Sequence, residues 1–188
     1  MSIFKKLFKS KQPPQSAPAV LTGTTAYFTP FSGNAYESDV YRAAVDAIAR
    51  HAAKLRGAHI IRTQDGRQPG DDGLNYLLGV RPNPYMSAYD ALYKLVTHYF
   101  AYNDSFGYIQ RGDSGDVAAL YPLDVTGMQF VTDPSDTLYC KCFFPNGKQY
   151  ILPYSDIIHL RRHFNRNDLL GDDNSAILPA VRLALFPG

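Results

Sequence analysis

The densest group of residues that could do chemistry lies near the end of the chain. Ser155, Asp156 and His159 are the residue types of a hydrolytic triad. The cationic residues that follow them are Arg161, Arg162, His163 and Arg166. On a strand, residues 159, 161 and 163 would share one face. Catalysis needs a nucleophile beside a general base, and no glycine elbow or second motif supports a triad. The sequence therefore predicts no enzyme. A phosphate-contacting patch fits these residues better, and a solvated or intersubunit face fits them best.

Two other groups resemble metal or redox sites in composition alone. Asp71-Asp72 and Asp172-Asp173 are carboxylate pairs in polar turns, where such residues are usually solvated. Cys140 and Cys142 stand two apart, so on a strand both side chains point to one face. They are too close for a relaxed disulfide, and there is no CxxC motif. We expect buried or half-buried reduced thiols, which fits a cytoplasmic origin, and no metal or cofactor.

Composition places the chain among ordinary globular proteins. It has 188 residues, of which 45% are hydrophobic and 19% are charged, enough for one domain with a real core. The net charge is only +2, and four of the 19 basic residues lie in the first eleven: Lys5, Lys6, Lys9 and Lys11. The remaining 15 face 17 acidic residues, so the body carries about −2. A slightly acidic domain is poorly suited to sequence-specific DNA binding. It does suit a surface past which DNA slides. No apolar run is long enough to cross a membrane.

Residues 1–35 differ in composition from the rest of the chain. Residues 1–11 predict a mobile basic arm that becomes ordered only in an assembly; a weak membrane-surface helix is a second interpretation. Residues 12–34 are rich in Pro, Ser, Thr and Gly and predict a linker, with little regular structure before Tyr36. We therefore divide the chain into a flexible part, 1–35, and a folded domain, 36–188.

The best-defined stretch of the folded part is 75–111. A helix ends near Gly79, because Pro82 and Pro84 bracket Asn83 and force the chain to turn. Ser87 and Asp90 have capping-box spacing, so the next helix should run from Ser87 to about Phe100. The segment 103–105 then breaks that helix before a strand at 106–111.

The remaining patterns complete an α+β fold. An earlier helix is predicted over 37–56, followed by a strand at 58–63 and a polar turn at 64–73. The expected buried stripe of that helix is Val40, Ala44, Ile48, Ala52 and Leu55. Further strands are predicted at 117–121, 125–131, 138–144 and 149–152, joined by turns that include Asn146-Gly147, and a last helix begins near Ser175. We expect N-terminal helices packed on a mostly antiparallel sheet of hairpins.

Two phrases carry a family resemblance. The run Arg81-Pro82-Asn83-Pro84-Tyr85-Met86-Ser87 resembles a signature of tailed-phage portal proteins of the siphophage type. The run Asp156-Ile157-Ile158-His159 resembles a second phrase of that family. The segment 102–109 also resembles the family, except that Asp104 and Ser105 replace small residues. The residues that carry the match are Arg81, Pro82, Asn83, Pro84, Met86, Asp156 and His159.

The resemblance implies the wing-like α+β domain of a portal protein. Such proteins are homo-oligomeric, dodecameric rings at one capsid vertex of the virion, assembled in the host bacterial cytoplasm and not in a membrane. Double-stranded DNA passes through the ring non-specifically during packaging and ejection. Terminase, capsid and head–tail adaptor proteins dock on the ring, which is not itself an ATPase. The residues that could contact DNA or a partner are Lys5, Lys6, Lys9, Lys11, Arg161, Arg162 and Arg166.

The match covers about residues 40–185, whereas the family continues into stem and clip regions. We therefore expect this chain to be an N-terminal fragment that cannot form a complete channel alone. Two alternatives stay open: a stand-alone α+β protein-interaction module, and a non-functional prophage remnant. Self-assembly of the extended protein separates these hypotheses, because a portal forms rings and an interaction module does not.

Overall fold

The computed structural model describes residues 24–28, 36, 38–164 and 168–171. Their contacts divide into two compact units, one containing 24–28 and 125–154 and the other containing 38–124 and 155–171. Helices and mostly antiparallel sheets confirm the predicted α+β class. In the described part, no helix is long and apolar enough to span a bilayer.

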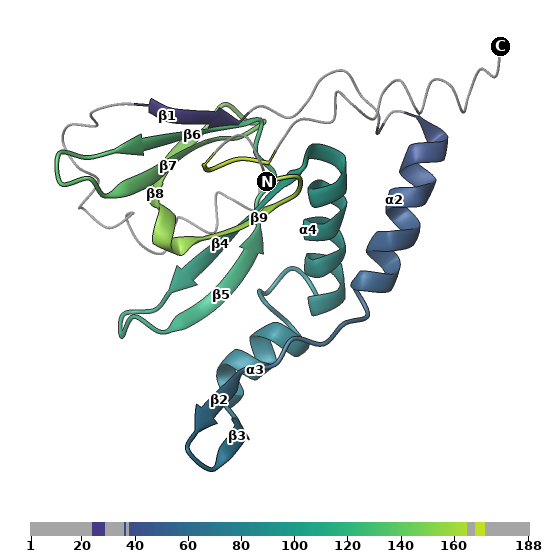
Figure 1. The fold of residues 1–188 in the computed structure, drawn as a ribbon, viewed down its shortest axis with the longest axis vertical. Coiled ribbons are helices and arrows are strands. Elements are labelled where there is room, and N and C mark those ends of the chain that lie inside the picture. Colours follow the sequence, from purple (N-terminus) through teal and green to yellow (C-terminus); the bar gives the residue numbers. More distant parts are fainter. Residues whose placement is uncertain (1–23, 29–35, 37, 165–167, 172–188) are drawn as a thin grey trace. The chain divides into compact units, whose positions relative to one another are not determined.

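The first unit is a four-stranded antiparallel sheet in the order β1-β6-β7-β8 (Figure 1). Its strands are β1 (Thr24–Phe28), β6 (Gly127–Thr132), β7 (Leu138–Phe143) and β8 (Gln149–Pro153). Paired positions of β6, β7 and β8 form one buried row: Met128, Phe130, Cys140, Cys142 and Leu152. Both thiols are free and fully buried, as the spacing predicted. Strand β1 corrects one expectation, because it lies inside the segment predicted to lack regular structure.

The second unit contains a three-stranded antiparallel sheet in the order β5-β4-β9. Its strands are β4 (Asp104–Arg111), β5 (Val117–Pro122) and β9 (Ile157–Arg161), and the short 3-10 helix η2 (Tyr154–Asp156) precedes β9. The turn between β4 and β5 was predicted, and Gly115 there has a φ of 89°, a conformation that glycine adopts without strain. β5 is an edge strand, so its outer N–H and C=O groups need other partners.

Helices α3 (Asp72–Gly79) and α4 (Ala88–Tyr102) lie on either side of the proline turn, as predicted. Ser87 and Asp90 form a full capping box at the start of α4: the Ser87 hydroxyl accepts from the Asp90 N–H at 3.1 Å, and the Asp90 carboxylate accepts from the Ser87 N–H at 3.1 Å. Asn103 ends the helix in the left-handed conformation with a φ of 62°. The helix predicted from Ser175 lies outside the described residues.

Helix α2 (Asp39–Ala52) packs against α4 through a face next to the predicted one, rotated from it by roughly a third of a turn. Val45 and Ala49 are buried, whereas Val40 is 57% and Ile48 is 44% exposed. Two tyrosines fix this register: the Tyr41 hydroxyl donates to the Phe100 carbonyl at 2.6 Å, and the Tyr93 hydroxyl donates to Asp46 at 2.7 Å. The prediction was wrong because this helix carries apolar residues on two adjacent faces, and α4 covers the face that includes Tyr41, Val45 and Ala49.

A hairpin not foreseen from the sequence joins α2 to α3. Its strands are β2 (Ile60–Thr63) and β3 (Gly66–Pro69), where only β2 and a polar turn were expected. All eight residues are exposed. A ribbon exposed on both faces shows no alternation of apolar and polar residues, so periodicity could not reveal β3.

Candidate functional site

The proline turn, which we call the elbow (residues 81–86), is fastened to the edge of β5. The Leu120 N–H donates to the Pro82 carbonyl at 2.8 Å, and the Asn83 side-chain amide donates to the Leu120 carbonyl at 2.8 Å. The N–H and C=O groups of Leu120 point away from β4, at the edge where a further strand could pair. The elbow provides hydrogen-bond partners for both of them. Asn83 is only 3% exposed, and its Oδ1 accepts from the Tyr85 N–H at 2.9 Å, which holds the turn closed.

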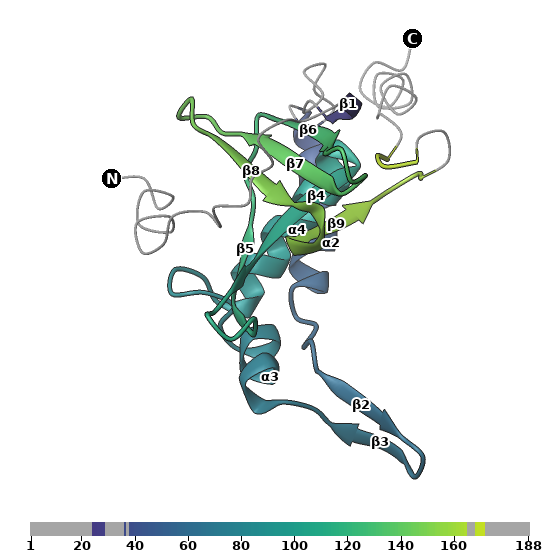
Figure 2. The same ribbon diagram turned by 90° about the vertical axis from the view of Figure 1, so that its left-hand side faces the viewer.

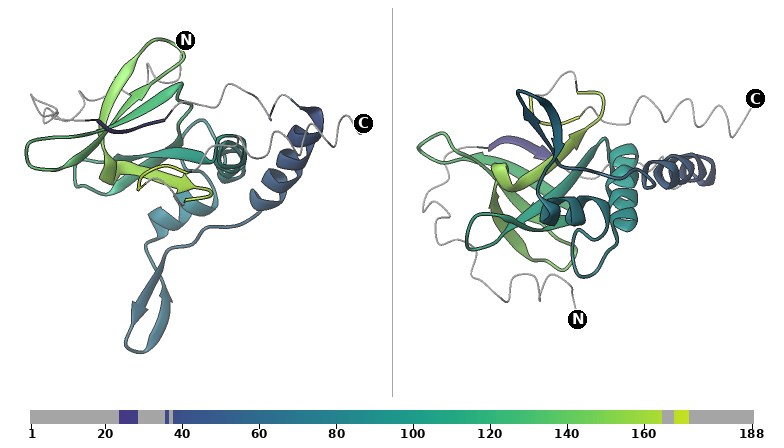
Figure 3. Two further views of the ribbon diagram at one scale, coloured as in Figure 1. Left: turned by 45° about the horizontal axis from the view of Figure 1, so that its top comes forward. Right: turned by 90° about the horizontal axis from the view of Figure 1, so that it is seen from below.

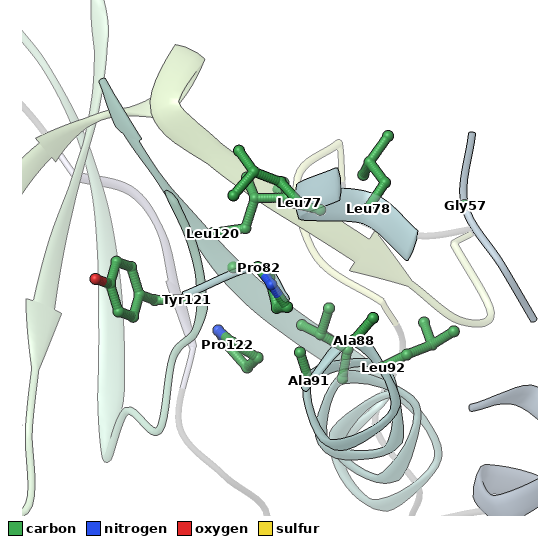
Figure 4. A pocket seen from close by; sticks show the side chains of 13 residues that line it. Gly57, Leu77, Leu78, Pro82, Ala88, Ala91, Leu92, Leu120, Tyr121 and Pro122 are labelled. Atoms are coloured by element: carbon green, nitrogen blue, oxygen red, sulfur yellow. The ribbon is translucent and has the colours of Figure 1, made fainter. Parts of the chain in front are cut away.

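An apolar cavity of about 190 Å³ lies under the elbow (Figure 4). Pro82 forms part of its wall, between Leu120 of β5 and Ala91 of α4. Apart from Tyr121, the side chains that line it are aliphatic. The cavity can accept an apolar group, but its lining has no group that would activate a substrate.

The signature residues of the elbow divide by exposure. Pro82 and Asn83 are buried and hold the turn in place. Arg81 and Pro84 are exposed, and Met86 is half-buried. The elbow is thus a structural joint between α3, α4 and β5, and its exposed side chains remain available to a partner.

The other two signature residues stabilise the sheet at separate places. Asp156 accepts a hydrogen bond from Arg111 Nε at 2.8 Å, which ties η2 to the end of β4. His159 lies in β9 and its Nε2 is 2.9 Å from Asp104 Oδ1, with both side chains almost fully buried at 2% and 3% exposure. The His159 ring also packs on Phe106, with centroids 4.5 Å apart.

Asp104 holds one more segment in place. The Gly171 N–H donates to Asp104 Oδ1 at 3.0 Å, and the Arg162 N–H donates to the Asn103 carbonyl at 2.7 Å. Gly171 lies so close to Asn103 that an added Cβ would be 2.6 Å from the Asn103 carbonyl oxygen. Asp104, which departs from the small residues of the resembled family, thus joins β4, β9 and the segment after β9.

The cationic residues after His159 do not form the single strand face that was predicted. β9 ends at Arg161, and His163 beyond it is in the left-handed region with a φ of 53°. Arg161 lies over the Phe164 ring at 4.1 Å, and Arg162 lies over the Phe100 ring at 4.7 Å. Arg166 and the arm lysines Lys5, Lys6, Lys9 and Lys11 lie outside the described residues, so their contact with DNA or a partner stays a prediction.

No triad forms around His159. Asp156 is bound to Arg111, the His159 ring is held by Asp104, and Ser155 is exposed. Over the residues that the structure describes, no three His, Cys, Asp or Glu side chains gather as a metal site. Burial raises the pKa of the Cys142 thiol to about 12 and that of Cys140 further still. Both are therefore protonated, weak nucleophiles at neutral pH.

The signature residues thus connect the elbow to β5 and hold the strands of the second unit together. Comparison with known proteins identifies the family. The sequence model described as "Phage portal protein" matches residues 39–182, most of the chain. The chain belongs to the phage portal protein family. This match includes the elbow, the Asp156 and His159 phrase, and every element of the second unit. Comparison with curated proteins found no match.

Chains in three solved structures share the fold of this chain. A chain in the neck of a native gene transfer agent (GTA) particle, computed with C12 symmetry, superposes with a TM-score of 0.61 and 13% identity. A chain in the virion of the native particle gives 0.58 and 13%, and one in the neck of the empty particle, computed with C6 symmetry, gives 0.56 and 16%. The alignments cover 86%, 79% and 80% of this chain but only 44%, 39% and 39% of those chains. The present chain therefore spans about two-fifths of the length of these structural neighbours.

Proposed function

We propose that this chain is the wing part of a portal subunit, a component of the head–tail connector of a phage-type virion. In the assembled ring, copies of the subunit surround an opening through which double-stranded DNA is packaged and ejected. The family match over residues 39–182 is the observation that carries this proposal. Similarity to neck chains from particles computed with C12 and C6 symmetry supports a cyclic homo-oligomer, for which twelve subunits is our expectation.

The geometry supports a passive, non-enzymatic role. The buried polar pairs each join two secondary-structure elements, as Asp104 and His159 join β4 to β9. A ring component must keep its shape under mechanical load. Hydrogen-bonded contacts between elements, such as those of the elbow with β5, contribute to this rigidity. Terminase, capsid and head–tail adaptor proteins are the partners we propose, with assembly in the host cytoplasm.

Electron microscopy of the purified protein tests this proposal. The product of the complete reading frame that encodes this chain should form closed rings with cyclic symmetry. A protein that stays monomeric over the whole accessible concentration range would instead favour the alternative of a stand-alone interaction module. The exposed apolar side chains of α2 suit either function, so self-assembly is the observation that separates them.

A further inference from the structure

The β2–β3 hairpin stands clear of the other elements of its unit (Figures 2 and 3). Each of its eight strand residues is exposed, including Ile60 at 54% and Ile61 at 47%. An isolated two-stranded ribbon is at best marginally stable in water. Its shape must therefore be maintained from its base or by a partner.

The base of the hairpin is tied firmly to α3. The His59 N–H donates to Asn75 Oδ1 at 2.6 Å, and the Asn75 amide donates to the Gly70 carbonyl at 3.3 Å. The Asp71 N–H donates to His59 Nδ1 at 3.0 Å, and a side chain at Gly70 would collide with the His59 ring. These contacts set the direction in which the hairpin points, so little ordering cost remains when its far end binds a partner.

One face of the hairpin concentrates positive charge. Arg62 pairs directly with Arg67 across the ribbon, and Ile60 pairs with Pro69 two positions nearer the base on the same face. Like charges directly opposite each other destabilise a strand pair. Within the described part of the chain neither guanidinium forms an ion pair, so this face favours an anionic ligand next to an apolar one.

A groove elsewhere on the same unit has the matching character. It lies between the start of α3 and the β4–β5 turn and has a volume of about 680 Å³. Leu74, Leu77 and Val117 contribute apolar lining, and Asp71 and Asp116 contribute carboxylates. Neither carboxylate forms an ion pair with another described residue. The one cation in the lining, Arg111, is already paired with Asp156.

We propose that the β2–β3 hairpin of one copy of this chain binds in the α3/β5 groove of the next copy. Arg62 and Arg67 then face Asp71 and Asp116, while Ile60 and Pro69 contact the leucines of the groove. Because the hairpin and the groove are different surfaces, the contact is heterologous and repeats from copy to copy, which generates a ring when the rotation closes. This inference rests on the proposed portal function and assigns one of its subunit contacts.

Charge complementarity alone would also fit phosphates of DNA. The apolar pair beside the arginines favours a protein partner, because a phosphate backbone offers nothing to bury Ile60 and Pro69. The groove provides both an apolar and an anionic component in one place. DNA binding by the hairpin is therefore treated as an outcome that would overturn the proposal.

Thiol cross-linking tests the contact directly. An R67C variant is mixed with a D116C variant of the complete reading-frame product, and a short bifunctional maleimide is added. The native Cys140 and Cys142 are fully buried and give little background. Cross-linked pairs should form in this mixture but not when K148C, at the exposed β7–β8 turn, replaces D116C. Equal yields with K148C, or no product with D116C, would overturn the proposal.

Charge reversal supplies the second measurement. R62E/R67E should weaken assembly, measured by sedimentation velocity, by about tenfold or more, and adding D116R should recover part of that loss. The control K54E/K148E changes the net charge equally at exposed sites outside the hairpin and the groove and should assemble normally. Normal rings from R62E/R67E would refute this contact while leaving the proposed function intact, and the same result with weaker DNA binding would assign the hairpin to DNA. Failure of the unmodified protein to assemble would count against both.

Discussion

At the scale of single residues, three buried polar side chains, Asn83, Asp104 and His159, join neighbouring elements. Asn83 is the clearest example, because one side chain closes the elbow and docks it on β5. Its amide donor and its carbonyl acceptor are both used, and only asparagine offers the two at this length. This accounts in physical terms for the central position of the Arg-Pro-Asn-Pro signature.

Replacing Asn83 with alanine should lower the free energy of unfolding by about 2–3 kcal/mol, because two hydrogen bonds are lost and buried backbone groups are left without partners. Urea denaturation measures this change. Arg81→Ala is the matched control: its exposed side chain makes it cost less than about 0.5 kcal/mol. Equal effects of the two variants would contradict the structural function assigned to Asn83.

His98 predicts a dependence of stability on pH. Burial, helped by the nearby Lys94 charge and partly opposed by Asp124, lowers its pKa from 6.5 to about 4. Between these values the unfolded chain binds a proton that the folded chain does not, so stability falls as the pH falls from about 6.5 to 4. The loss should reach about 2–3 kcal/mol near pH 4.

Comparison with His98→Gln isolates the contribution of His98 to the pH dependence of stability. The carboxylates titrate in both proteins, so their contribution cancels in the difference. The difference in unfolding free energy between them should change between pH 7 and pH 4.5, with the variant gaining relative to the original. A difference that stays constant with pH would show that His98 is protonated equally in the two states.

At the scale of elements, the sequence pattern of α2 predicted where the helix lies but not which face is buried. Its existence and its N-terminal position were predicted within two residues, because apolar periodicity and an acidic first turn are local signals. Its buried face was predicted wrongly, since that face depends on α4, which lies some fifty residues away in sequence. The capping box of α4 was predicted fully because both of its residues belong to the same turn.

Valine substitutions on α2 test the observed face. Val45→Ala should cost about 1–3 kcal/mol, because Val45 is 1% exposed and its loss leaves a cavity against α4. Val40→Ala, the same chemical change at a site that is 57% exposed, should be nearly neutral. Chemical denaturation compares the two variants, and a larger cost at Val40 would restore the face predicted from periodicity.

The segment after β9 provides a second test at this scale. Gly171→Ala would place a methyl group against the backbone oxygens of Asn103 and Arg162, which cannot move aside as a flexible side chain would. We expect a loss of about 1–3 kcal/mol in thermal or urea unfolding. Gly112→Ala serves as the control, since its nearest neighbour atom would be 3.8 Å away. A neutral Gly171→Ala variant would show that this segment is not held against Asn103 and Arg162.

The Asp104–His159 pair was the main feature of the site that could not be predicted. Its partners are 55 residues apart and meet only because β4 and β9 become neighbours. The sequence offered one signal, a carboxylate at a position where the resembled family has small residues. Recognising its partner required the strand pairing, which periodicity does not specify.

At the scale of the whole molecule, the subunit combines tightly held joints with two unlike surfaces, the hairpin and the groove. The elements that carry the family resemblance are internal joints, whereas the exposed surfaces are those with unbalanced charge. Such a division suits a ring component, because rigid subunits transmit load and complementary surfaces define their repeat.

We propose that copies of this protein assemble into the ring of a portal. Electron-microscopic class averages of the purified complete reading-frame product test it most directly. We expect closed rings with a central opening and cyclic symmetry, which should be twelvefold. Particles that remain monomeric, or that assemble only into open filaments, would contradict it.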